Sequence, residues 1–454
     1  MYACKQGHIE TLKILLDRGA DYNKCNRYGL SPLRIACKHV HTEIVKMLLD
    51  RGADCNKCNS FGQSPVLKVC KYGQTELVKI FLGRGSDCNT CDRWGLSPVM
   101  EACEHGHTEI VKMLLDSRVD YNKCNSYGQS PVLKACEDGH TEIVKMLLDR
   151  GADCYKWDIW GRHSPVMKAC EHGHTEIVKM LLDSRVDYNK CNSYGQSPIM
   201  KVCEHGHTEI VKILLDRGAD YNKCNGRVES PVMKACEHRH TERVKILLDR
   251  GADCNKCNGR GESPVMCACK HGHTEIVKIL LDRGADCNMC DRNDESSLMK
   301  ACKHGHTEIV KILLDKGADY SKWDLYGRSH VMIACEFGHA EIVKILLVRG
   351  ADCNILDRNE ELPLMKACEL GLTEIVNILL DSGADYNKRD SSGKSPVIKA
   401  CENGHTEIVK MLLDKGADCT SRNLKVQKAL MTADVRGHID TVALIIQHFS
   451  QTQI

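Results

Sequence analysis

The sequence predicts an all-α solenoid of stacked helix-turn-helix units joined by β-hairpin-like loops. Residues 97–125, SPVMEACEHGHTEIVKMLLDSRVDYNKCN, return at 164–192 with a single change, from Glu101 to Lys168. Prolines also recur at a spacing of 33, as at Pro32, Pro65, Pro98 and Pro131. Self-similarity at a period of about 20 to 50 residues is typical of repeat proteins, whose units bury a core only by stacking on their neighbours.

Each unit is expected to contain two helices. Ser-Pro opens the first, because a serine hydroxyl caps free amides and proline at the first helical position loses no hydrogen bond. This helix is expected to end near His105 and Gly106, and Thr108 is expected to cap the second helix. One apolar face of the second helix demands burial, formed by Ile110, Val111, Leu114 and Leu115. A Gly-Ala-Asp turn ends it, and Asn and Gly bracket the loop that follows.

The order S-P-L/V, A-C, G-H-T-E-I-V-K, L-L-D-x-G-A-D and N within 33 residues closely resembles the ankyrin repeat. The resemblance covers residues 1 to about 446. The main departure is that the Thr-Pro-Leu-His opening of the family reads Ser-Pro-Val-Met here, as at 97–100. We therefore expect a partial repeat at 1–26, twelve full repeats at 27–423, and a degenerate capping repeat with a tail at 424–454.

The two ends of the array differ. Residue 1 falls inside a first helix with no polar capping unit before it, so an apolar N-terminal face and a chain that continues upstream are expected. Residues 424–449 keep parts of the repeat and end in a polar segment, which is interpreted as a closing cap.

Several units break the pattern. Arg118 and Arg185 replace the glycine that ends the second helix, at a cost of about 1 kcal/mol each if the left-handed conformation is kept. Arg243 replaces a core isoleucine, and Arg239 replaces the glycine between the helices of the same unit. The repeat at 226–258 is therefore predicted to be the least stable.

The composition argues against several classes of partner. Lys plus Arg is 63 and Asp plus Glu is 61, so the net charge of +2 gives no reason to expect nucleic acid or an anionic membrane as partner. No signal peptide and no run of 18 apolar residues is present. The 29 cysteines follow the repeat positions, which favours reduced thiols used as small core residues in a cytoplasmic protein, with the nucleus also possible.

Candidate metal and catalytic patterns are also present. C-x-x-C pairs occur at Cys55/Cys58, Cys88/Cys91, Cys254/Cys257 and Cys287/Cys290. Stacked helices lie about 8 to 10 Å apart, whereas four sulfurs on one zinc must lie within about 4 Å of one another. This difference argues against a four-cysteine zinc site.

His-x-His pairs recur at His105/His107, His172/His174, His205/His207, His271/His273 and His304/His306. Their second member occupies the family's Gly-His turn, so they are interpreted as structural. No nucleophile or phosphate-binding motif is found, so no enzyme, cofactor or metal site is predicted.

The candidate binding residues lie at the hairpins. The resemblance implies that a partner meets the hairpin tips and the concave face of the first helices; in the unit 93–125 these positions are Arg93, Trp94, Leu96, Glu104, His105 and Cys124. Aromatic residues recur at the hairpins, namely Phe61, Trp94, Tyr127, Trp157, Trp160, Tyr194, Trp323 and Tyr326. The continuous part of this stripe ends at Tyr194, and a partner surface is predicted at 93–195. The alternative is that the rings only stack on adjacent hairpins.

Two function classes stay open. The first is a monomeric, non-catalytic scaffold or adaptor that binds a protein partner, as the resemblance implies. The second is the repeat region of a larger protein whose enzyme, channel or ubiquitin-ligase-recruiting part lies outside these residues.

Lysines and glutamates alternate on the first helices at i,i+3 spacing, which predicts a solvated, self-paired face. They are Lys134, Lys168, Lys201 and Lys234 with Glu137, Glu171, Glu204 and Glu237.

Overall fold

The computed structural model describes residues 1–419 and 424–452, and it confirms an all-α architecture of paired helices. Two compact units divide the chain, residues 1–226 and 227–454. The predicted boundary at 423/424 adjoins residues 420–423, which lie outside the described residues, as do 453 and 454 at the end of the predicted tail.

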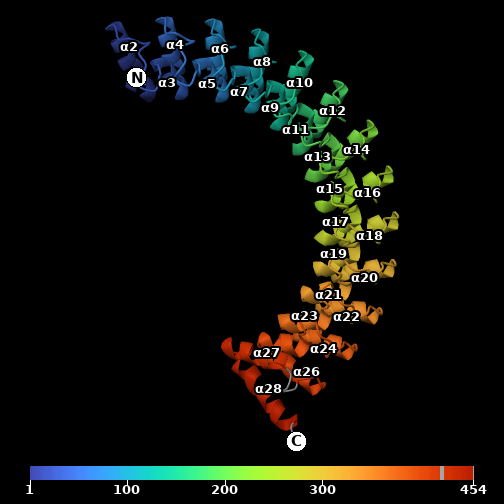
Figure 1. Ribbon diagram of the computed structural model, residues 1–454. Coiled ribbons are helices and arrows are strands. Elements are labelled where there is room, and N and C mark those ends of the chain that lie inside the picture. The colour runs from blue at the N-terminus through green and yellow to red at the C-terminus, as the bar shows by residue number, and fades with distance from the viewer. Residues whose placement is uncertain (420–423, 453–454) are drawn as a thin grey trace. The chain divides into compact units, whose positions relative to one another are not determined.

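In the first unit, first and second helices form two rows, visible in Figure 1 as the odd-numbered and even-numbered labels. The first helices are α1 (Tyr2–Gln6), α3 (Pro32–Lys38), α5 (Pro65–Lys71), α7 (Pro98–Glu104), α9 (Pro131–Glu137), α11 (Pro165–His172) and α13 (Pro198–His205). The second helices are α2 (Ile9–Asp17), α4 (Thr42–Asp50), α6 (Thr75–Gly83), α8 (Thr108–Asp116), α10 (Thr141–Asp149), α12 (Thr175–Asp183) and α14 (Thr208–Asp216).

The second unit repeats this arrangement. Its first helices are α15 (Pro231–Glu237), α17 (Pro264–His271), α19 (Ser297–Lys303), α21 (His330–Glu336), α23 (Pro363–Leu370), α25 (Pro396–Glu402) and α27 (Leu424–Val435). Its second helices are α16 (Thr241–Asp249), α18 (Thr274–Asp282), α20 (Thr307–Asp315), α22 (Ala340–Val348), α24 (Thr373–Asp381), α26 (Thr406–Asp414) and α28 (Ile439–Thr452). Antiparallel bridges close two loops, Cys290 with Ser296 and Trp323 with Ser329.

The helix starts confirm one sequence expectation and correct another. The hydroxyl of Ser97 accepts a hydrogen bond from the Met100 N–H at 3.3 Å, so Ser-Pro caps the first helix as predicted. Thr108 is not a cap. Helix α8 begins at Thr108 itself, His107 occupies the cap position, and no side chain bonds the free amides there.

The core lies between the helix rows. Ile110, Val111 and Leu114 of α8 are fully buried, as are Ala102 and Cys103 of α7. Burial raises the pKa of the Cys103 thiol far above its usual range, so this cysteine stays protonated and packs as a small apolar residue. All 29 cysteines are free thiols.

A histidine joins most pairs of neighbouring repeats. His107 Nε2 lies 3.0 Å from the carbonyl oxygen of Lys71 in the preceding repeat. The ring lies against Gly73, where an added Cβ would come within 2.6 Å of His107 Cε1. Glycine is therefore required by the neighbouring ring as well as by its own positive φ of 70°. Where Val40 replaces this glycine, the following repeat carries Gln74 in place of the histidine.

Several residues with side chains adopt the left-handed conformation that glycine favours. Arg118 and Arg185 have φ of 60° and 61°, so both keep the conformation at the predicted cost. Arg239 has φ of 60° in the repeat predicted to be least stable, and Arg243 of that repeat is 8% exposed. The β-branched Val228 also has φ of 62°.

His330 replaces the opening proline of its repeat and is fully buried. Its Nδ1 lies 3.1 Å from the Tyr320 carbonyl oxygen, and its Nε2 lies 3.2 Å from the Ser296 hydroxyl oxygen. A carbonyl oxygen can only accept, so Nδ1–H donates to Tyr320; Nε2 of the neutral ring then accepts from the Ser296 hydroxyl, which itself accepts the Met299 N–H. Burial lowers the pKa of His330 to about 4, which keeps the ring neutral.

Both ends of the array expose apolar side chains. Tyr2 near the N-terminus is 74% exposed. Helices α27 and α28 pack on α25 and α26, but Met431, Val435 and Ile439 are 70%, 87% and 72% exposed. Helix α28 continues to Thr452, so the predicted polar tail is helical through that residue.

Candidate interaction surface

Most of the described hairpin tips are held by an Asn or Asp at their base, as at Asn125. Asn125 Oδ1 accepts the N–H groups of Tyr127 at 2.9 Å and Gln129 at 3.0 Å. Its Nδ2 donates to Gln129 Oε1 at 2.9 Å. This side-chain-to-backbone turn fixes the tip without a long strand pair, because the asparagine replaces ladder hydrogen bonds.

Neighbouring tips are joined through the backbone. The N–H of Arg93 donates to the Phe61 carbonyl at 3.1 Å, and the N–H of Ser126 donates to the Trp94 carbonyl at 2.8 Å. The N–H of Ile159 continues the series to Tyr127 at 3.0 Å. These bonds place residues about 33 apart side by side, so aromatic side chains at equivalent positions meet.

The rings stack in pairs. Phe61 and Trp94 have centroids 6.2 Å apart at an interplanar angle of 12°, and Tyr127 and Trp160 are 5.8 Å apart at 26°. Stacking does not bury them, because Phe61, Tyr127 and Trp160 remain 40%, 44% and 49% exposed, and Tyr194 is 53% exposed. The rings therefore do stack on adjacent hairpins, as in the alternative interpretation, and they also keep exposed area that a partner could cover.

The other candidate residues lie at different places on the unit. Leu96, Cys124 and Trp157 are partly buried at the hairpins, and the Lys190 ammonium lies 5.7 Å above the Trp157 ring. Glu104 and His105 follow at the far end of α7, about 10 Å along the helix from the tip at 1.5 Å per residue. His105 is exposed and stacks on His107 at 6.0 Å. The tips and the α7 end are thus two separate surfaces.

Ion pairs cover the first helices. The predicted i,i+3 pairs form, for example Lys168 with Glu171 at 3.4 Å and Lys134 with Glu137 at 3.7 Å. Lys168 also reaches Glu137 of the preceding repeat at 2.9 Å. Burial by itself lowers the pKa of Lys168, but hydrogen bonds and charge from the two glutamates outweigh it, so the pKa is raised. The face is self-paired within and between repeats.

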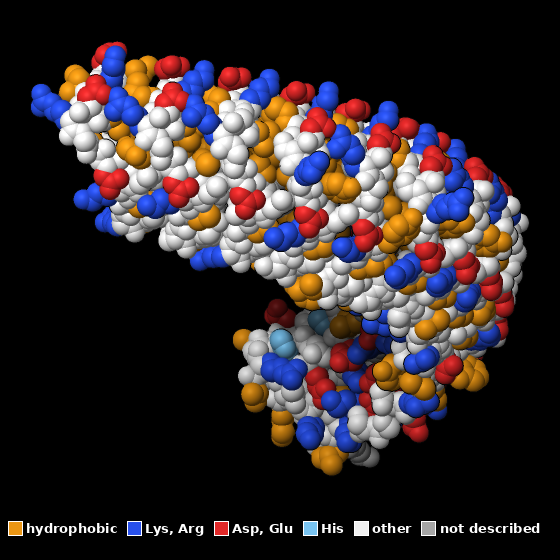
Figure 2. Space-filling model, turned by 90° about the horizontal axis from the view of Figure 1, so that it is seen from above, with side chains coloured by type: hydrophobic (Ala, Val, Ile, Leu, Met, Phe, Trp, Pro, Cys, Tyr) orange, Lys and Arg blue, Asp and Glu red, His pale blue; other side chains and the backbone are white. Residues whose placement is uncertain are grey.

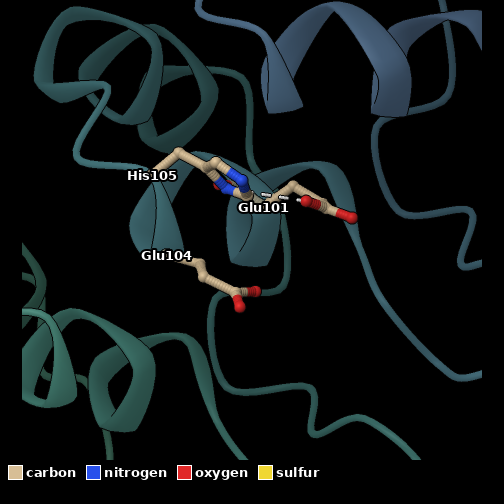
Figure 3. A group of neighbouring side chains, drawn as sticks. All are labelled: Glu101, Glu104 and His105. Carbon is tan, nitrogen blue, oxygen red and sulfur yellow. Dashed lines mark hydrogen bonds and ion pairs between the residues drawn. The ribbon is translucent and has the colours of Figure 1, made fainter.

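Glu101 reverses this polarity. It stands where neighbouring repeats carry lysine, and its carboxylate pairs at 3.1 Å with Lys71, which stands where the next repeat carries Glu104. One ligand atom each of Glu101, Glu104 and His105 lies within 4.8 Å of the others, and Figure 3 shows the three side chains on α7. Lys71 holds Glu101 and Lys134 holds Glu104 at 3.2 Å. A cation would have to displace both ammonium groups, so these contacts form an ion-pair network.

The surface charge is mixed as well as balanced. In Figure 2 acidic and basic side chains alternate along the visible face without gathering into a patch of one sign. No helix in residues 1–419 or 424–452 is long and apolar enough to cross a membrane.

Comparison with known families fits this architecture. The family described as "Ankyrin repeats (3 copies)" matches residues 66–158, 155–225, 232–324, 299–390 and 331–423. The family described as "Ankyrin repeats (many copies)" matches residues 1–49 and 37–82. The chain is an ankyrin-repeat protein. A search of curated proteins gave no match.

The ankyrin repeats carry a second exposed apolar surface, outside the predicted stripe. Trp323 and Tyr326 are 61% and 59% exposed. Beside Trp323 a groove of about 640 Å³ is also lined by Ile355 and Leu356. The sequence contains a signal for it, because Ile355-Leu356 replaces the Lys-Cys pair found at this hairpin position in other repeats, such as 256–257.

Proposed function

We propose that this ankyrin-repeat protein is a non-catalytic scaffold that binds a protein partner through the hairpin tips from Phe61 to Tyr194. Ankyrin repeats are generally protein-interaction modules, and the family matches extend over most of the chain. The observation that carries the proposal is the row of stacked rings, of which Phe61, Tyr127 and Trp160 are exposed and Trp94 is partly buried. Such rings bury a large apolar area on binding and lose little conformational freedom.

Backbone geometry supports the same surface. The tips are fixed by turns and by bonds to the neighbouring tips, so a partner would meet a pre-organised row of rings. The first-helix face is a weaker candidate, because its lysines and glutamates already neutralise one another. We also propose a reducing compartment, cytosol or nucleus, since a buried thiol recurs in each repeat core from Cys4 to Cys401.

The test uses the whole chain. A partner captured by the full-length protein is identified and purified, and its affinity is measured by calorimetry for wild type and for Trp94→Ala plus Trp160→Ala. Loss of one hot-spot ring costs about 2 kcal/mol, which is about 30-fold in affinity, so the double variant should bind at least about 30-fold more weakly. Trp323→Ala plus Tyr326→Ala in the second unit is the control, because it removes two exposed rings that lie outside the predicted stripe. Unchanged affinity of the first variant, with its thermal unfolding also unchanged, would refute the proposal.

A further inference from the structure

Arginines accompany the rings at the hairpin tips of the first unit. We define the tip ridge as residues 26–30, 59–63, 92–96, 125–129, 158–163 and 192–196. Arg27 Cζ lies 4.7 Å from the Tyr28 ring centroid. Arg93 Cζ lies 4.6 Å from the Phe61 ring and 4.1 Å from the Trp94 ring. Arg162 Cζ lies 5.2 Å from the ring of Tyr194. Each guanidinium is thus held against an aromatic face.

These guanidinium groups make no ion pair within the described residues, unlike other arginines of the same unit. Arg51, Arg84 and Arg150 each pair with an aspartate of the preceding repeat; for Arg150 and Asp116 the distance is 2.6 Å. The stacked arginines keep their hydrogen-bond donors available at the ring edge. Ring stacking leaves the fork of N–H groups that recognises carboxylates in place, because it uses only the flat face of the guanidinium.

The acidic residues of the ridge point inward. Asp92 and Asp158 are 6% and 5% exposed. Asp92 Oδ1 accepts the N–H of Trp94 at 2.9 Å, and Asp158 Oδ2 lies 2.7 Å from His163 Nδ1. The ridge therefore presents rings and positive charge to solvent, although the chain as a whole carries a net charge of only +2.

We propose that the tip ridge binds an extended, acidic segment of a protein partner, whose carboxylates pair with Arg27, Arg93 and Arg162 while its apolar side chains cover the rings. The inference rests on the proposed function and names the chemistry of the partner. The three arginines lie on alternate tips. With helices stacked about 10 Å apart, successive arginines are on the order of 20 Å from one another. An extended chain rises about 3.3 Å per residue, so acidic side chains about six residues apart match this spacing.

The geometry favours a peptide over single-stranded nucleic acid. Bases bind such platforms by stacking on open ring faces. At the Phe61–Trp94 pair each ring already has a neighbouring ring, with centroids 6.2 Å apart, and the Arg93 guanidinium against it, which leaves fewer open faces for bases. Carboxylates need only the edges of the guanidinium groups, which stay accessible.

The test selects peptides from a phage-displayed library of random 16-residue sequences on the purified full chain. We expect enriched sequences to combine Asp or Glu with aromatic or aliphatic residues, and the synthetic peptides to bind more weakly as salt increases. Arg27→Gln plus Arg93→Gln plus Arg162→Gln should weaken binding at least tenfold. The matched control, Arg51→Gln plus Arg84→Gln plus Arg150→Gln, removes the same charge from ion-paired positions and should change affinity less than twofold.

Three results would overturn the inference. They are recovery of no peptide, recovery of sequences without acidic residues, and equal binding by the Arg27/Arg93/Arg162 variant and wild type. Tighter binding of a labelled oligouridylate than of any selected peptide would also overturn it, in favour of nucleic acid. Failure of the inference is distinguishable from failure of the proposed function. If the captured partner is lost by the Trp94/Trp160 variant but kept by the Arg27/Arg93/Arg162 variant, the tips are the interface and the acidic chemistry is wrong.

Discussion

Acidification should destabilise the repeat that contains His330. Burial lowers the pKa of this ring to about 4 from its ordinary value of 6.5. Between these values the unfolded chain binds a proton that the folded chain does not, so stability is complete above pH 6.5 and falls as the pH drops toward 4. One pKa unit corresponds to about 1.36 kcal/mol, which gives a loss of roughly 1 to 2 kcal/mol at pH 5.5 and about 3 kcal/mol below pH 4.

The assay is thermal unfolding of wild type and His330→Pro at pH 7.5 and 5.5. Proline opens this helix in most other repeats and restores the Ser-Pro pattern, so the fold should tolerate it. The expected outcome is a larger loss of stability in wild type than in the variant, because the other titrating groups are common to both. The ring proton signals of His330 should not shift between pH 7.5 and 5.5. A His330 titration midpoint near 6.5, or an equal loss in both proteins, would refute the reasoning.

The other predictions concern the backbone. Arg118→Gly should stabilise the protein by about 1 kcal/mol in thermal unfolding, because φ is 60° there; a neutral or destabilising result would contradict the strain. Gly106→Ala should cost more than Gly151→Ala, since an added Cβ meets His140 Cε1 at 2.5 Å in the first case and nothing within 4 Å in the second. Both glycines have positive φ, of 73° and 79°, so equal costs would refute the steric role of the histidine. Hydrogen exchange should be fastest in the repeat that contains Arg243, and equal protection in its neighbours would count against this.

Much of the fold could be predicted from the sequence because the rules involved are local. The Ser97 cap and the buried face of Ile110 and Leu114 follow from residues within one or two helical turns. The Thr108 prediction was wrong for a related reason, since threonine is a good cap in isolation. Here His107 occupies that position because its ring contacts the preceding repeat.

The candidate surface was only partly predictable. The aromatic positions could be located by register, but their pairing could not, because it depends on the twist between neighbouring tips. The reversed pair of Lys71 and Glu101 was visible as two separate substitutions, and only stacking shows that they compensate one another. Comparing each repeat with the next at these two positions would have found it.

The sequence by itself determined the period, the helix pairs and the buried positions, because each of these follows from propensity, capping and apolar spacing over a few residues. Only the tertiary structure decided which atoms of successive repeats meet. The histidine bond to the preceding carbonyl, the lysine-glutamate pairs across repeats and the guanidinium groups resting on rings all join residues about 30 or more apart. Those contacts depend on the distance and rotation between stacked units, which side-chain packing sets and no single repeat encodes.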